Sequence, residues 1–170
     1  MRNPFTLLAA VLLVCLGTPA VSQAQNQTTP LSVTLNGKKV TGTVVSAISY
    51  GGNLDVEFKT SLGTKLTLEI YRNTFSPLPF QVGFDESQSN EDRGRVGKFF
   101  YFDSADANAP YYGPGKGTIT ITAFNAATKA VSGTFTFSLK RTGTNLPAAE
   151  RGKTVSLTEG RFTNVVFKQM

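Results

Sequence analysis

The acidic residues are the side chains of this sequence that could do catalytic chemistry, because the chain contains no histidine. Without histidine there is no Ser-His-Asp or Cys-His constellation and none of the usual zinc sites. Asp55 and Glu57 are two residues apart, so on a β-strand they share one side, and Glu69 follows on the next predicted strand. Paired carboxylates are the machinery of glycoside hydrolases. The alternative is a solvated outer face that also carries Lys59 and Lys65.

Aromatic residues gather in the middle of the chain and form the second candidate site. Small-molecule sites are mostly apolar with a few polar groups, so these rings could line a pocket for an apolar or aromatic ligand. The alternative is a hydrophobic core that is covered by its own long loop. The residues selected for the pocket are Phe80, Phe84, Phe100, Phe102, Tyr111 and Tyr112.

Two acidic segments and one glycine-rich segment have compositions typical of calcium and phosphate sites, but their residue spacing and position do not match those sites. Acidic residues gather in 85–92 and 103–108, yet neither range has the spacing of a calcium-binding EF-hand loop. Residues 111–117 are glycine-rich and contain Lys116, but they lead into a predicted strand, whereas a phosphate-binding loop opens a helix. We predict no metal site and no cofactor.

The elements that must position these residues are β-strands, because apolar residues recur at every second position from Leu31 onward. The first run ends at Asn36-Gly37, a dipeptide typical of a two-residue hairpin turn. The same alternation continues through 54–58, 66–70, 117–124 and 131–139.

The last segment changes the phase of its alternation. Val155 and Leu157 fall in one phase, whereas Phe162 and Val166 fall in the other. Because a shift of one residue moves every following side chain to the opposite face, we predict a bulge or turn at Glu159-Gly160.

These patterns predict an all-β fold, namely an antiparallel β-sandwich of about eight strands, with a flattened β-barrel as the alternative. Residues 73–94 lose the alternation and contain Pro77 and Pro79, so we expect a long loop there. Residues 98–102 resume as a strand, and 111–117 are expected to form a turn-rich connection.

The first 24 residues have the features of a removable secretion signal. One positive charge precedes the apolar run Phe5–Leu16, which is too short to span a bilayer, and Ser22–Ala24 fits a signal peptidase site. Residues 25–30 are polar and are expected to be a disordered lead-in. Residues 31–170 are predicted to form one β domain, in a protein that is secreted or periplasmic and has no transmembrane segment.

Cys15 is the only cysteine and raises an alternative, a lipoprotein signal that would anchor the protein to a bacterial membrane. Such signals require a small residue before the cysteine, and Val14 is bulky, so we favour release. The mature chain then has no disulfide. It also loses Arg2, which leaves 16 basic and 11 acidic residues and a net charge of +5. The basic residues are scattered, so no binding to nucleic acid is expected.

Three segments of the last third together resemble a family of small exported all-β proteins of unknown function from Bacteroidota. They are Gly117–Thr122, Val131–Phe137 and Val155–Val165, and the resemblance covers residues 94–167. It implies a shared fold and export but no activity. Many members look like lipoproteins, a feature that this chain does not share convincingly.

The residues of these segments are assigned structural roles. Gly133 in the middle of a strand permits close approach of another backbone. Phe135 and Phe137 are expected to fill the core, and Gly160 fits the phase change.

The sequence therefore predicts an exported noncatalytic binding or structural module, with an apolar ligand pocket as its candidate site. The competing hypothesis is the carboxylate-dependent hydrolase, which would act on an extracellular glycan.

Overall fold

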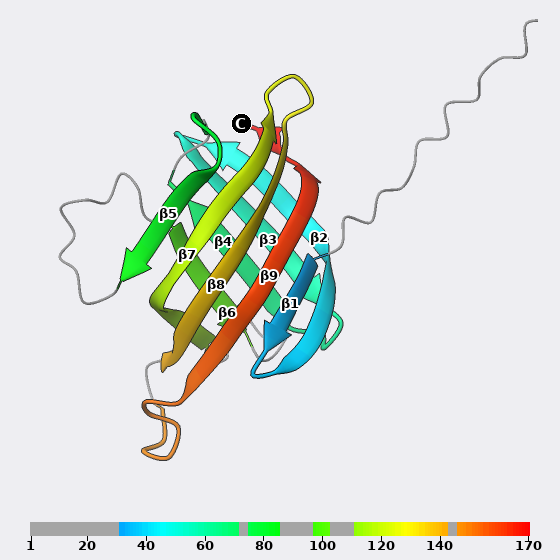
Figure 1. Ribbon diagram of the computed structural model, residues 1–170. Helices are drawn as coiled ribbons and strands as arrows, with labels where there is room; N and C mark the ends of the chain where they lie inside the picture. The colour runs from blue at the N-terminus through cyan, green and yellow to red at the C-terminus, as the bar shows by residue number, and fades with distance from the viewer. Residues whose placement is uncertain (1–30, 72–74, 86–96, 103–110, 143–145) are drawn as a thin grey trace, which may run out of the picture.

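The computed structural model describes residues 31–71, 75–85, 97–102, 111–142 and 146–170. Its regular elements are strands (Figure 1). They are β1 (Leu31–Leu35), β2 (Lys38–Tyr50), β3 (Asn53–Thr60), β4 (Lys65–Ile70), β5 (Phe80–Asp85), β6 (Gly97–Phe102), β7 (Tyr111–Asn125), β8 (Ala130–Thr142), β9 (Thr154–Val166) and β10 (Lys168–Gln169). The predicted export signal, the lipidation alternative at Cys15 and the lead-in 25–30 lie outside the described residues. Within the described part of the chain, no helix is long and apolar enough to cross a membrane.

The strands form one curled sheet with the order β1-β9-β8-β7-β6-β4-β3-β2-β10. β5 pairs with β7, and β1 pairs with β2 as well as with β9. All pairings are antiparallel except that of β10 with β2. The predicted all-β antiparallel fold is confirmed, and its single sheet curls into a half-barrel. We call β5, β7, β8, β9 and β1 the front half and β2, β3, β4 and β6 the back half (Figure 1).

The hairpins of the first third follow the predicted strands. Asn36 and Gly37 both have positive φ, 46° and 82°, which is the conformation that a two-residue hairpin turn requires. Gly51 and Gly52 likewise have positive φ and join β2 to β3. Short turns therefore join β1 to β2 and β2 to β3 as antiparallel neighbours.

The predicted loop over 73–94 is wrong in part, because β5 lies inside it. Val82 is buried opposite Ile119 of β7, and Phe80 pairs with Ile121. The strand is short and follows Pro79 directly, so its alternation is too brief to stand out in the sequence. β5 forms because its backbone pairs with that of β7.

The turn-rich connection expected at 111–117 is also wrong, because these residues are the first half of β7. Pro114 is accommodated at a register shift between β7 and β8, the kind of position where a strand tolerates proline. A Cβ on Gly115 would lie 2.4 Å from the carbonyl oxygen of Ser138. Glycine here permits close approach of the neighbouring backbone.

The predicted bulge in β9 is confirmed. The register with β8 shifts between Phe135, which pairs with Gly160, and Phe137, which pairs with Leu157. Glu159 has a φ of 51° and absorbs the extra residue, so Leu157 and Phe162 both point inward.

A second bulge in β9 was not predicted. Asn164 has a φ of 53°, and its amide donates to Ser132 Oγ at 2.7 Å. As a result Val165 is fully buried while Val166 is 62% exposed. The prediction that Val166 shares the phase of Phe162 is therefore wrong.

The core of the front half contains three cross-strand pairs of glycine and phenylalanine. A Cβ built on any of these glycines would lie 2.3 to 2.6 Å from the facing ring, so each ring occupies the space that a side chain would need. The pairs are Gly117 with Phe137, Gly133 with Phe162 and Gly160 with Phe135. The structural roles predicted for these residues are confirmed.

The core of the back half is built from aliphatic residues of β3 and β4. Leu54, Val56, Leu66, Leu68 and Ile70 are at most 1% exposed. The two halves meet where the ring of Phe58 in β3 lies 6.4 Å from that of Phe162 in β9. Side chains from both halves therefore form one continuous cluster.

Candidate functional site

Of the aromatic residues selected for a pocket, Phe80, Tyr111 and Tyr112 have described side chains, and none of the three lines either hollow found among the described residues. Phe80 is partly buried against the core, and its ring centroid lies 5.7 Å from that of Phe75. Phe75 is itself 4% exposed and contacts Phe124 edge to face at 5.3 Å. Phe80 therefore belongs to the core, which is the alternative that the sequence left open.

The other selected residues lie on β5, β6 and β7. Phe84 stands opposite Gly117, Phe100 opposite Thr67, and Phe102 opposite both Lys65 and Tyr111. The side chains of Phe84, Phe100 and Phe102 lie outside the described residues. Tyr111 and Tyr112 are half-buried on β7, and the Arg141 guanidinium lies 4.9 Å from the ring centroid of Tyr112.

The three carboxylates are brought together as the strand spacing predicts. Asp55 stands directly opposite Glu69 in the pairing of β3 with β4, and Glu57 stands opposite Thr67. Their neighbours Leu54, Val56, Leu66 and Leu68 are buried, so the acidic positions lie on the outer face of the back half. Like charges directly opposite one another are unfavourable, and nearby donors offset this cost.

Each of the three carboxylates has a neighbouring hydroxyl or ammonium group as its partner. The Tyr50 hydroxyl donates to Asp55 Oδ2 at 2.9 Å, and the Tyr71 hydroxyl donates to Glu69 Oε2 at 3.2 Å. Lys65 Nζ lies 3.2 Å from Glu57 Oε1. The hydrogen bond to Asp55 and the charge of that carboxylate raise the pKa of the Tyr50 hydroxyl above its ordinary value.

Two of these acids open onto a groove of about 500 Å³, which we call the carboxylate groove. Tyr50 is 47% exposed and presents its ring beside Asp55. Met170 joins the groove because its amide donates to the Ser49 carbonyl, alongside the pairing of β10 with β2. The lining residues are Ser46, Ile48, Tyr50, Asp55, Glu57, Thr67 and Met170.

Sequence reasoning selected Asp55 and Glu57 but missed the remaining members of the carboxylate groove. The signal for Tyr50 was present, since it follows the outward positions Ser46 and Ile48 at a spacing of two residues. Met170 carried no such signal, because it reaches the groove only through the short parallel strand β10.

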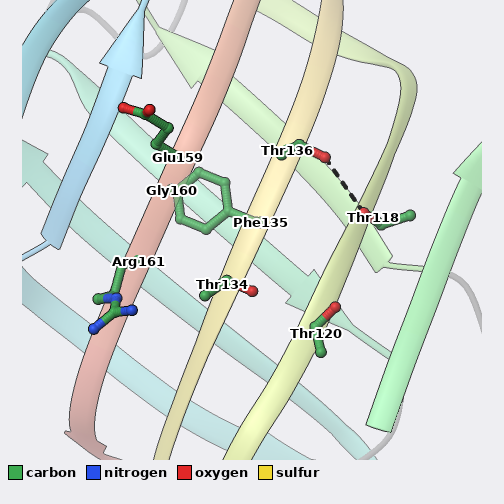
Figure 2. Close-up of a pocket in the computed structure, with 8 residues that line it drawn as sticks. All are labelled: Thr118, Thr120, Thr134, Phe135, Thr136, Glu159, Gly160 and Arg161. Carbon is green, nitrogen blue, oxygen red and sulfur yellow. Dashed lines mark hydrogen bonds between the residues drawn. The ribbon is translucent and has the colours of Figure 1, made fainter. Parts of the chain in front are cut away.

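A second hollow, of about 330 Å³, lies on the outer face of the front half, and we call it the threonine hollow (Figure 2). Four threonines from β7 and β8 border it, together with Glu159 and Arg161 of β9. Its lining residues are Thr118, Thr120, Thr134, Phe135, Thr136, Glu159, Gly160 and Arg161. The alternation of threonine in 118–122 and 134–136 was visible in the sequence, but the neighbouring arginine was not.

No group of three or more histidine, cysteine, aspartate or glutamate side chains within the described ranges is placed to hold a metal ion. Comparison with protein-family models, with curated proteins and with solved structures gives no match to this chain. The resemblance to the exported Bacteroidota family therefore stays a prediction, and function has to be argued from the two hollows.

Proposed function

We propose that this protein is an exported, noncatalytic binding module that holds a saccharide in the carboxylate groove. Export rests on the signal features of residues 1–24. The binding role rests mainly on one observation, the meeting of Asp55 and Glu57 with the exposed ring of Tyr50 in one open groove.

An outer site is favoured over an internal pocket by the packing of the aromatic cluster. Phe75 contacts both Phe80 and Phe124, and the Phe124 ring stacks on Phe167 at 6.3 Å. Rings at such distances fill space by contacting one another. This argues against an apolar ligand pocket built on Phe80 and in favour of a ligand bound at the surface.

The chemistry of the carboxylate groove suits a ligand with many hydroxyl groups. Carboxylates accept hydrogen bonds only, and the donors on Asp55 and Glu57 fix where their remaining lone pairs point. An exposed tyrosine ring offers a flat apolar face to the C–H side of a sugar ring. Ile48 and Met170 add apolar contact at the same groove.

The same contacts argue against the hydrolase. Glycoside hydrolysis requires one of the two carboxyl groups to donate a proton to the leaving oxygen. Here Asp55 accepts from the Tyr50 hydroxyl, and Glu57 faces the Lys65 ammonium, so both act as acceptors. The open groove also leaves the carboxylates in contact with water.

The experiment is a titration of the full mature chain with neutral oligosaccharides, such as cellohexaose, xylohexaose and mannohexaose, followed by amide chemical shifts. We expect shifts centred on the carboxylate groove for one of them. Tyr50→Ala should weaken binding about tenfold through the lost ring contact. Asp55→Asn and Glu57→Gln should weaken it severalfold, because hydrogen bonds to a charged acceptor are stronger than those to an amide.

Glu150→Gln is the matched control, because it removes one partly exposed carboxylate from the turn before β9, away from the groove. It should bind like the wild type. Absence of shifts with every sugar, or unchanged binding by Tyr50→Ala, would overturn the proposal. New reducing ends that disappear in Asp55→Asn would favour the hydrolase instead.

A further inference from the structure

The threonine hollow contains a cation with no ionic partner in the described structure. Arg161 is exposed, and no hydrogen bond or ion pair joins its guanidinium to another described residue. It stands opposite Thr134 of β8 and Ser32 of β1, which are both uncharged. A guanidinium presents five donors in a planar fork, so Arg161 offers an open site for an anion.

The bulge in β9 creates the space beside this cation. Gly160 turns inward against the ring of Phe135, and so no side chain covers the outer surface at that point. Figure 2 shows Glu159 and Arg161 pointing apart on either side of Gly160. The result is a depression between two side chains, with the Phe135 ring beneath it.

The acidic residue at the rim is already engaged. Glu159 Oε2 accepts a hydrogen bond from the Thr34 hydroxyl of β1 at 2.9 Å. This contact draws the Glu159 carboxylate away from Arg161 and toward β1. Glu159 still borders the hollow, and its negative charge disfavours an ion of high charge there.

The rest of the hollow is hydroxylic. Thr118 and Thr136 face each other with their hydroxyl oxygens 3.4 Å apart, and Thr120 pairs with Thr134 in the same register. Each threonine hydroxyl can both donate and accept. The row therefore matches a ligand whose own hydroxyl groups lie next to its charge.

We propose that the threonine hollow binds the carboxylate-bearing ring of an acidic saccharide, a hexuronate. The carboxylate pairs with the Arg161 guanidinium through two parallel hydrogen bonds, as planar anions do. The ring hydroxyls bond to Thr134 and Thr120, and the volume of about 330 Å³ fits one sugar unit. A single negative charge is favoured over a phosphate because Glu159 stands at the rim.

The experiment titrates the full mature chain with trigalacturonate at low salt, and in parallel with trimannose and with inorganic phosphate. We expect trigalacturonate to shift the amides of 159–161 and 134, and to bind at least tenfold more tightly than either comparison ligand. Binding should weaken as salt is added, because an exposed ion pair is screened.

Four variants test the assignment. Arg161→Gln should weaken binding about tenfold, and Arg161→Lys severalfold, because lysine keeps the charge but loses the fork. Glu159→Gln should strengthen binding about threefold by removing a like charge near the site. Lys59→Gln, which removes an exposed cation from the outer face of the back half, is the control and should bind like the wild type.

Circular dichroism establishes that each variant is folded. Equal binding of phosphate and trigalacturonate would overturn the proposal, because the hydroxyl row would then contribute nothing. Wild-type affinity in Arg161→Gln, or weaker binding in Glu159→Gln, would do the same.

Discussion

The front and back halves of the sheet bury their inner faces with different side chains. In the back half, β3 and β4 point leucine, valine and isoleucine inward and contain no inward glycine. In the front half, three glycines on β7, β8 and β9 each face a phenylalanine on the neighbouring strand. The back half fills its core with medium-sized aliphatic side chains, whereas the front half places a phenylalanine ring in the space that each facing glycine leaves open.

The outer faces differ as well. The back half carries the charged residues Asp55, Glu57, Lys59 and Lys65, whereas the front half carries a row of threonines with Arg161 beside it. The comparison teaches that two different packing solutions can bury the inner face of one sheet, and it implies that stability depends more on the inner faces than on the exposed outer ones. The four predictions below test this division, from the largest expected effect to the smallest.

Phe162→Ala should produce the largest loss, because its ring joins the two halves. Phe162 is 1% exposed and lies 6.4 Å from Phe58 and 6.5 Å from Phe135. We expect the free energy of unfolding to fall by about 4 kcal/mol in urea titrations. Val166→Ala on the same strand, where the side chain is 62% exposed, should change it little. A loss below about 1 kcal/mol in Phe162→Ala would contradict this view of the core.

Gly160→Ala should break one glycine–phenylalanine pair. The new Cβ would lie 2.3 Å from the Phe135 ring, so we expect unfolding to become easier by about 2 kcal/mol. Gly83→Ala on β5 is the control, because nothing lies within 4 Å of its Cβ. It should be neutral or stabilising by about 0.5 kcal/mol. Equal stability of the two variants would show that the ring moves aside freely.

Changes on the two outer faces should both be small. Glu57→Gln removes an ion pair with Lys65 in which the side chains are 29% and 45% exposed, and pairs this exposed contribute about 0 to 1 kcal/mol. Thr134→Val on the front half should also stay within about 0.5 kcal/mol. Thermal unfolding at low and high salt measures both. A decrease of more than about 2 kcal/mol in the free energy of unfolding of either variant would contradict the view that stability depends mainly on the inner faces.

The smallest effect is a titration in the carboxylate groove. The hydrogen bond to Asp55 raises the pKa of the Tyr50 hydroxyl. The neutral hydroxyl therefore stabilises the folded state at pH values below the ordinary tyrosine pKa. This contribution is lost as pH rises through the raised value. The absorbance difference between wild type and Tyr50→Phe should report the raised pKa, and Asp55→Asn should return it toward normal. An unchanged value in Asp55→Asn would mean that the hydrogen bond does not form in solution.

Much of the fold was predictable because burial of one sheet face leaves a period of two in the sequence. That period located β1, β3, β4 and β8, and Asn36-Gly37 marked the first turn. The loss of phase after Leu157 located the bulge at Glu159, since only an extra residue can keep Phe162 inside. These features depend on residues that are near neighbours in the chain.

The candidate sites were predictable only in part. Asp55 and Glu69 come together through one short hairpin, so their meeting followed from local pairing. Arg161 and Thr120 are brought to one hollow by two successive strand pairings, β9 with β8 and β8 with β7. No local sequence pattern predicts that these two residues lie close together. The aromatic residues were grouped because they are close in the sequence, whereas the register distributes them over β5, β6 and β7 and places Phe102 directly opposite Tyr111.

By itself, the sequence determined that this chain forms strands, where the first hairpin turns, and which side chains β1, β3, β4 and β8 bury. These properties depend on alternation and on turn residues, which act over a few positions. Only the tertiary structure decided that β5 forms on the edge of β7, that β10 returns to β2, and that three glycines lie under three rings. Those outcomes depend on which distant strand supplies the neighbouring backbone, and alternation within one strand carries no information about its partner.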